Sequence, residues 1–189
     1  GDNPALFKHA DVETRMRRAM VAAVMPRSSG FDLSWVPQVS EATKVFMSFV
    51  MFIGGGSTST AGGIRVTTFA VILLVCKAAF TGHSDVNAFH RRIHTHVIMT
   101  AVSITTACFA LVLVASMALL LITDASFSHA LFDACSSFGL GGYSVGVAQE
   151  GSDAALYVLA ATMVVGRLGP MPLAYAVSRP KQLDVVRYP

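Results

Sequence analysis

The sequence predicts an all-α membrane protein in which long transmembrane helices alternate with short re-entrant helices, and in which one transmembrane helix is broken. Three observations predict this fold class. Only 13% of the 189 residues are charged while 53% are hydrophobic, whereas a soluble domain usually carries about 25% charged residues. The run 95–123 contains no Asp, Glu, Lys or Arg and exceeds the roughly 20 residues that a spanning helix needs. Finally, an internal repeat relates the two halves of the chain.

The repeat appears when the sequence is shifted by 112 residues. The matched pairs are Gly30 with Gly142, Phe31 with Tyr143, Ser40-Glu41 with Ser152-Asp153, and Gly54 with Gly166. Each unit is predicted to be a short helix, a glycine loop, an acidic helix start and a long span. The span 95–123 precedes the second unit, and no matching span precedes the first. We therefore expect the sequence to be a fragment.

The predicted organisation follows this repeat. Residues 1–80 form the first unit without its first helix, with a short helix, a glycine loop and a broken helix at 39–80. A linker at 81–94 leads to the complete second unit at 95–178, and a basic tail at 179–189 ends the chain. The second unit is predicted to contain a span at 95–123, a short helix at 126–138, a loop at 139–146 and a span at 152–178.

The distribution of Lys and Arg predicts the orientation in the membrane. No Lys or Arg lies between Thr123 and Ala154, while the linker and the tail both carry them. Because cytoplasmic loops are enriched in Lys and Arg, we place the linker and tail in the cytoplasm and both glycine loops outside. The basic residues within 1–20 disagree with this orientation.

The two glycine loops are predicted to bind a cation. The short apolar segment before Gly141 is too short to span, and irregular backbone at membrane depth persists only when it is buried or lines a cavity. Successive carbonyls in a glycine loop can replace the hydration shell of an ion. The string Leu140 to Ser144 resembles the Thr-Val-Gly-Tyr-Gly filter of potassium channels. The candidate ligands are Ser28, Ser29, Gly30, Phe31, Leu140, Gly141, Gly142 and Tyr143. A pair of ordinary external turns is the alternative.

The helix predicted over 39–80 is interrupted at its centre by a glycine-rich stretch. Its residues are Gly54, Gly55, Gly56, Ser57, Thr58, Ser59, Thr60, Ala61, Gly62 and Gly63. Each glycine costs about 1 kcal/mol relative to alanine inside a helix, so we expect a loop between two helices. Three interpretations remain open, namely a polar plug that glycines hold weakly, a packing kink, and a phosphate cradle. For the last, the lysine of the G-x-x-x-x-G-K-[ST] pattern is missing after Gly62-Gly63.

Arg167 is a charge inside the last predicted span. Such an arginine costs at least about 2.5–3.5 kcal/mol at the centre of a membrane, so it should face a cavity or a partner. The repeat aligns Arg167 with Gly55 and therefore places both at a similar depth. We expect Arg167 to contact the 54–63 loop, because free carbonyls there suit its guanidinium donors.

Four strings carry a resemblance to a known family: MFIGGGSTSTAGGIRVTTF, PRSSGF, FGLGGYSVG and VVGRLGPMPLA. They closely resemble the Trk/Ktr/HKT potassium transporters, and the chain resembles a partial third repeat and a complete fourth. The resemblance implies four helix–pore loop–helix repeats around one pore in the cytoplasmic membrane. It puts filter glycines at Gly30 and Gly142, an intramembrane gate at 54–63 and a gate-facing arginine at Arg167.

The same resemblance implies the partners and the transported ion. The chain would lie in the lipid bilayer with the N-terminal half of the same transporter. It would form a homodimer and bind a cytosolic ring of nucleotide-binding regulatory subunits. The transported ion would be K⁺ or Na⁺, bound at the filter carbonyls.

Other chemistry receives little support from the sequence. The three cysteines lie in apolar surroundings without metal-like spacing, which is typical of buried small hydrophobes. His90 and His94 would be four residues apart on a helix, a spacing that suits a metal, but a solvated linker is the preferred interpretation. We therefore expect no enzyme activity, no further cofactor, no transition-metal site and no nucleic-acid partner. The alternative function is a membrane-embedded enzyme or binding module that uses the 54–63 loop for phosphate.

Overall fold

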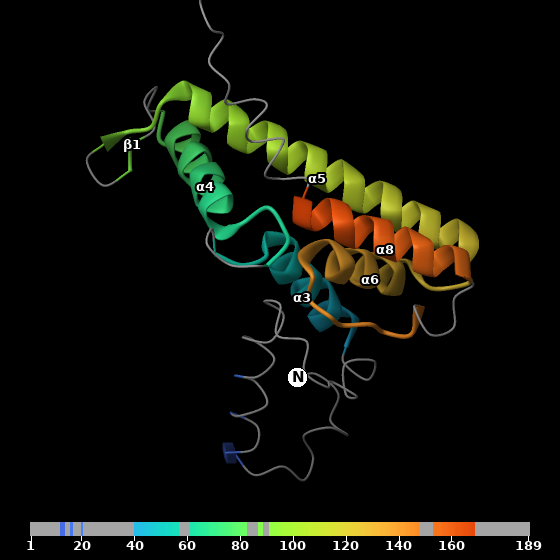
Figure 1. Ribbon diagram of the computed structural model, residues 1–189. Helices are drawn as coiled ribbons and strands as arrows, with labels where there is room; N and C mark the ends of the chain where they lie inside the picture. Colours follow the sequence, from blue (N-terminus) through green and yellow to red (C-terminus); the bar gives the residue numbers. More distant parts are fainter. Residues whose placement is uncertain are drawn as a thin grey trace, which may run out of the picture.

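The computed structural model describes residues 12, 13, 16, 20, 40–56, 61–82, 87–88, 91–147 and 153–168. The described chain is helical apart from one pair of two-residue strands, so the predicted all-helical character is confirmed (Figure 1). The helices are α3 (Glu41–Ile53), α4 (Val66–Phe80), α5 (Thr95–Ile122), α6 (Phe127–Gly139) and α8 (Asp153–Leu168).

Helix α3 begins where the sequence places a capping residue. The backbone of Ser40 is extended, and its side chain accepts a hydrogen bond from the Thr43 N–H, which satisfies a donor that the helix itself leaves unpaired. The helix ends at Gly54, whose φ of 73° lies in the region that favours glycine. The chain then turns, and α4 begins at Val66.

The linker contains strands β1 (Asn87–Ala88) and β2 (Arg91–Arg92), which pair in antiparallel register. A helix that carries both His90 and His94 is therefore wrong. Extended backbone at 91–92 separates the two positions, and His94 is the N-cap of α5 with φ −64° and ψ 137°. The residues just before α5 pair as strands, and the apolar periodicity of α5 starts only after them.

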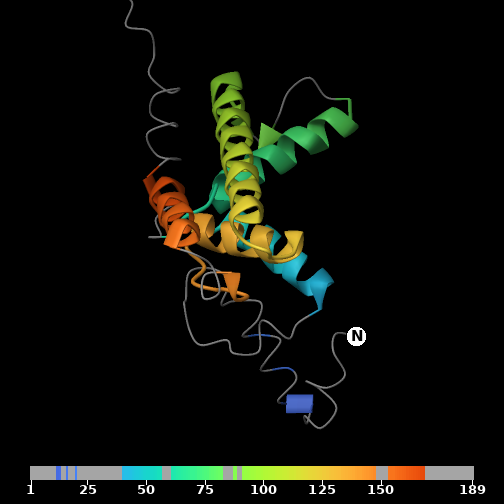
Figure 2. The ribbon, with the colours of Figure 1, turned by 90° about the vertical axis from the view of Figure 1, so that its right-hand side faces the viewer.

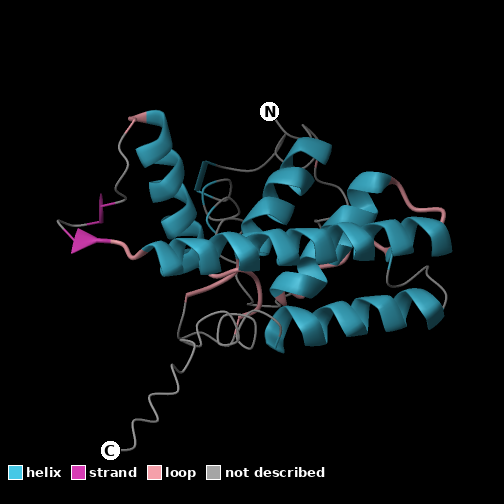
Figure 3. Cartoon of the chain, turned by 90° about the horizontal axis from the view of Figure 1, so that it is seen from above, coloured by secondary structure: helices cyan, strands magenta, loops and turns pink. Residues whose placement is uncertain are grey.

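Helix α6 occupies the centre of the molecule. It packs against α3, α5 and α8, and α8 also packs against α5. Figure 2 shows α3, α6 and α8 below the point where α4 and α5 diverge. Figure 3 shows α5 running past the ends of the other helices toward the strand pair. Nine of the thirteen residues of α6 are buried, so the end of α6 is held from three sides.

Helix α5 buries five small side chains together with Ile104, Val112 and Leu119, and it exposes several large apolar side chains. Its buried face includes Thr100, Ala101, Cys108, Ala115 and Ser116. The exposed side carries Met99, Phe109, Val114, Met117 and Leu121. Small residues let helices approach closely in lipid, where large apolar side chains can face outward without cost. This arrangement suits a bilayer better than water.

Within the described residues, α5 is the one helix long and apolar enough to cross a membrane by length and composition, and α4 is apolar but shorter. The 28 residues of α5 extend about 42 Å, more than the roughly 30 Å of a hydrocarbon core. Helix α4 has no buried residue, so its apolar surface also faces outward.

Candidate functional site

The loop that follows α6 reverses the chain at Leu140. This residue has φ 55° and ψ 39°, the left-handed conformation that commonly ends a helix. Gly142 and Gly146 also have positive φ, at 78° and 113°, where glycine avoids the strain of a Cβ atom. The loop therefore bends at three points within seven residues of α6.

Side chains of α6 hold the N–H groups of this loop. The Gly141 N–H donates to the Ser136 carbonyl at 2.8 Å, and the Tyr143 N–H donates to the Ser136 hydroxyl at 2.9 Å. The Val145 N–H donates to Oδ1 of Asp133 at 3.0 Å, and the Ser144 hydroxyl donates to Oδ2 at 2.8 Å. Three alternate N–H groups, at 141, 143 and 145, thus bind acceptors of one helix.

This pattern fixes the direction of the loop carbonyls. In a planar trans peptide, the carbonyl of one residue points opposite to the N–H of the next, and no cis peptide occurs in the described part of the chain. The carbonyls of Leu140, Gly142 and Ser144 therefore point away from α6, because the acceptors on α6 bind the N–H group of the next residue in each case. Three carbonyls that share one side form a row of oxygens suited to a cation.

The side chains of the loop alternate between buried and open positions. Gly141, Tyr143 and Val145 are buried, while Gly142 is exposed and Ser144 is half-buried. Tyr143 and Val145 pack into an apolar cluster with Met47 and Met51 of α3 and Phe132 of α6. Between Gly141 and Val145, the positions that are not buried carry only the small residues Gly142 and Ser144, which leaves the backbone there accessible.

The loop between α3 and α4 folds back onto the end of α3. The N–H groups of Ile64, Arg65 and Val66 donate to the carbonyls of Phe52, Ile53 and Gly55 at 3.2, 2.9 and 3.2 Å. These bonds satisfy carbonyls that the end of a helix leaves unpaired. They also occupy the N–H groups at the start of α4, which a phosphate would need.

Glycines in this loop allow backbone to touch backbone. A Cβ atom on Gly54 would overlap the Gly62 carbonyl oxygen, and one on Gly62 would lie 2.5 Å from the carbonyl oxygen of Phe138 in α6. A Cβ on Gly166 of α8 would overlap that same Phe138 oxygen. The loop, the end of α6 and α8 therefore meet at one peptide group. One interpretation of the sequence was that glycines hold this loop weakly, but Gly54, Gly62 and Gly63 pack closely against backbone, whereas Gly56 does not.

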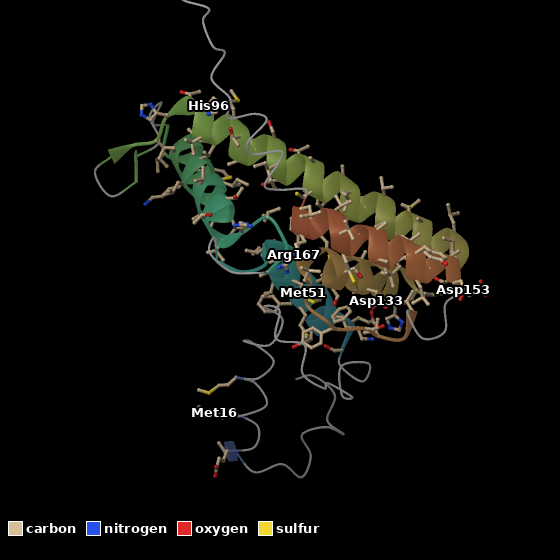
Figure 4. All side chains as sticks on the ribbon, viewed as in Figure 1. Met16, Met51, His96, Asp133, Asp153 and Arg167 are labelled. Atoms are coloured by element: carbon tan, nitrogen blue, oxygen red, sulfur yellow. The ribbon has the colours of Figure 1, made fainter. Side chains whose placement is uncertain are left out.

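Two predicted sites, the pair of glycine loops and the 54–63 loop, are described only in part. Ser28, Ser29, Gly30 and Phe31 lie outside the described residues, as do residues 57–60. Leu140 to Tyr143 form the loop after α6, and Gly54 to Gly56 and Ala61 to Gly63 belong to the loop between α3 and α4. Arg167 follows Gly166 on α8, one residue from the shared contact at Phe138. Figure 4 labels Met51, Asp133 and Arg167, one on each of the helices α3, α6 and α8 that surround this region.

Sequence reasoning missed two residues of the site, Asp133 and Ser136. Both are buried, with 2% and 3% of their surface exposed. The available signal was a carboxylate within the otherwise apolar string ALFDAC, because such a group is rarely buried unless it has partners. Among the described residues, no group of three or more His, Cys, Asp or Glu could hold a metal ion.

An apolar, outward-facing helical exterior and a loop with aligned carbonyls define the class of a helical membrane transport protein. Comparison with known families then places the chain. Residues 3–184 match the TrkH family, described as cation transport protein, and the chain belongs to this family. The family comprises cation transport proteins and not enzymes. The resemblance to potassium transporters is thereby confirmed.

Individual relatives agree with the family. The chain is 32% identical over 187 residues to Ktr system potassium uptake protein B of Bacillus subtilis, covering 99% of the chain and 42% of that protein. It is 32% identical to Ktr system potassium uptake protein D of the same organism, covering 86% of the chain and 36% of the relative. It is 29% identical to potassium/sodium uptake protein NtpJ of Enterococcus hirae, covering 86% and 37%. The chain thus spans less than half the length of these relatives.

Proposed function

We propose that this chain forms part of the pore of a potassium-uptake transporter in the cytoplasmic membrane. One observation carries the proposal, namely that the carbonyls of Leu140, Gly142 and Ser144 are turned away from α6 by hydrogen bonds to Ser136 and Asp133. Such carbonyls replace water around a dehydrated cation. The names of the relatives, which include potassium uptake and potassium/sodium uptake proteins, support K⁺ or Na⁺ as the ion.

The pathway would pass two elements in turn. An ion would shed water at two re-entrant filter loops, one around Gly142 and one around Gly30, and would then meet the 54–63 loop as a gate. Gly62 and Gly166 contact the same carbonyl of Phe138. This shared contact supports a gate whose position depends on the position of α8 and of Arg167. The complete pore would also require the N-terminal half of the transporter.

The partners and orientation belong to the same proposal. The 81–94 linker and the tail would face the cytoplasm, where a nucleotide-binding regulatory subunit would bind. The transporter would be a homodimer. The Ktr system proteins among the relatives are named as components of a system, which supports a regulated assembly.

The filter assignment is tested by Gly142→Ser in the transporter that carries this chain. Gly142 has φ 78°, so any side chain strains the loop and displaces its carbonyls. We expect uptake by a potassium-deficient host to continue with a changed preference between K⁺ and Na⁺. The measurement is uptake of each ion at equal amounts of protein in the membrane. Unchanged preference would contradict the filter assignment.

A further inference from the structure

We propose that Asp133 and Ser136 are positioning residues that determine the cation preference of the 140–147 loop. This inference rests on the proposed function, because it assumes that the loop carries the ion-binding carbonyls. Neither residue would touch the ion. Both would act by fixing where the loop carbonyls stand.

Asp133 holds the second half of the loop. Its carboxylate is 2% exposed and accepts from the Ser144 hydroxyl and from the Val145 N–H, one donor at each oxygen. The Ser144 hydroxyl in turn accepts the Gly146 N–H at 3.2 Å. Hydrogen bonds to an ionised group are shorter and about twice as strong as neutral ones. One buried carboxylate therefore fixes three consecutive residues.

Ser136 holds the first half of the loop. Its carbonyl accepts the Gly141 N–H, and its hydroxyl accepts the Tyr143 N–H. It thereby brackets Gly142, the exposed residue of this half. Because Ser136 lies one helical turn after Asp133 on α6, both anchors are presented on one face of a rigid element.

The other repeat unit lacks these anchors. The same 112-residue shift places Asp133 on Val21 and Ser136 on Val24. Neither valine side chain can accept a hydrogen bond. At these two aligned positions the sequence therefore carries side-chain acceptors in the second repeat unit only.

Fixed carbonyls favour the larger ion. Na⁺ is smaller than K⁺, so oxygens must move inward to coordinate it as well as water does. The anchors at 133 and 136 oppose that movement, because each inward shift of a carbonyl would lengthen the hydrogen bond that the N–H of the same peptide donates to α6. Loosening the anchors should therefore admit Na⁺ more than it impairs K⁺.

The experiment compares Asp133→Asn, Ser136→Ala and Ser144→Ala in the transporter that carries this chain. Asparagine keeps the size of the side chain but turns one acceptor into a donor, which must face the Ser144 hydroxyl or the Val145 N–H. We expect the ratio of K⁺ to Na⁺ uptake to fall about tenfold for Asp133→Asn, which corresponds to about 1.4 kcal/mol of selectivity, because the exchanged charge and donor displace the loop from its present position. Smaller falls are expected for Ser136→Ala and Ser144→Ala.

A matched control separates positioning from general stability. Ser116 of α5 is fully buried and bonds the Val112 carbonyl at 2.8 Å, so Ser116→Ala removes a buried hydroxyl away from the loop. It should lower stability as much as Ser136→Ala and leave the ion ratio unchanged. Asp133→Glu keeps the carboxylate and should recover part of the ratio.

The outcomes distinguish a failure of the positioning role from a failure of the proposed function. If the parent transporter takes up neither K⁺ nor Na⁺, the proposed function fails. If Gly142→Ser changes the ion ratio while Ser136→Ala and Ser144→Ala leave it unchanged, the function stands and the positioning role is overturned. If Asp133→Asn does not reach the membrane, the two serine variants decide the question alone.

Discussion

Close approach, and not only flexibility, accounts for glycine in the loop between α3 and α4. Gly54 and Gly62 each lie against backbone that a Cβ atom would overlap or crowd, whereas a Cβ atom on Gly56 would meet nothing within 4 Å. Gly166 contacts the same Phe138 carbonyl from α8. Individual glycines therefore make separable predictions.

Gly62→Ala should destabilise the protein by about 1–3 kcal/mol, because the backbone of α6 cannot move aside cheaply. The measurement is the thermal unfolding midpoint of the purified transporter in detergent. Gly56→Ala, in the same loop, should leave that midpoint unchanged. Equal midpoints for the two variants would contradict the close packing of Gly62 on Phe138.

Arg167→Ala should raise the rate of cation uptake and alter its voltage dependence, because the proposed gate would lose the cation that sets its barrier. Lys77→Ala removes an exposed cation from α4 and should change neither quantity. Electrical recording from the reconstituted transporter measures both. If Arg167→Ala behaves like Lys77→Ala, Arg167 does not act on the gate.

At the scale of elements, α6 links the parts of the site. Its C-terminal end carries the loop, its Phe138 carbonyl receives Gly62 and Gly166, and its N-terminal half contacts α3 through His129. Lys44 of α3 is 3% exposed, and its Nζ lies 2.9 Å from Nε2 of His129 and 2.9 Å from Oε1 of Glu41. This polar cluster fastens the two helices beside the loop.

The Lys44–His129 contact should appear as coupling in a double-mutant cycle. We expect Lys44→Met and His129→Gln to be non-additive by about 0.5–3 kcal/mol in unfolding free energy, since contacting residues couple in this range. Lys44→Met combined with Ser116→Ala on α5 should be additive. Additivity in both cycles would show that the short Nζ–Nε2 distance contributes nothing to the packing of α3 on α6.

At the scale of the whole molecule, large apolar side chains are exposed on the surface. Phe80 is 91% exposed and Leu121 is 85% exposed, at the far ends of α4 and α5. Other large apolar side chains of α5 are also exposed, among them Met99, Phe109, Val114 and Met117, and a contiguous apolar surface on a soluble monomer would mark a liability or an interface. On a membrane protein such side chains can face lipid.

The orientation is tested by labelling single cysteines in a background in which Cys76, Cys108 and Cys135 are replaced by alanine. Thr81 and Asp124 are both exposed, and they lie before and after α5 in the sequence. Asp124→Cys should react with an impermeant maleimide in intact cells, and Thr81→Cys only after permeabilisation, because α5 would cross the bilayer between them. Labelling of both positions from the same side would overturn the proposed topology.

Much of the fold follows from local pattern. The charge-free run 95–123 corresponds to α5 at Thr95–Ile122, and the short apolar segment 126–138 corresponds to α6 at Phe127–Gly139. The glycine stretch at 54–63 lies between α3 and α4. Length, hydropathy and the cost of glycine in helices are properties of neighbouring residues, so a sequence displays them directly.

The site was less accessible from the sequence. The spacing from Asp133 to Val145 is twelve residues, and no local rule predicts that one carboxylate binds both Ser144 and Val145. The contact of Gly62 and Gly166 with one carbonyl joins residues from three elements. His90 and His94 were considered as helix neighbours because strand pairing in the linker leaves no clear pattern in so few residues.

The sequence by itself determined that this chain is helical and suited to a membrane, because hydropathy and helix length can be read from neighbouring residues. Its division into two related units stays a prediction. The sequence also located the glycines around which the site is built. Only the tertiary structure decided what those glycines do and which side chains hold the loop. Hydrogen bonds and close backbone contacts depend on the approach of residues from α3, α6 and α8, and that approach is set by how three helices pack around one peptide group.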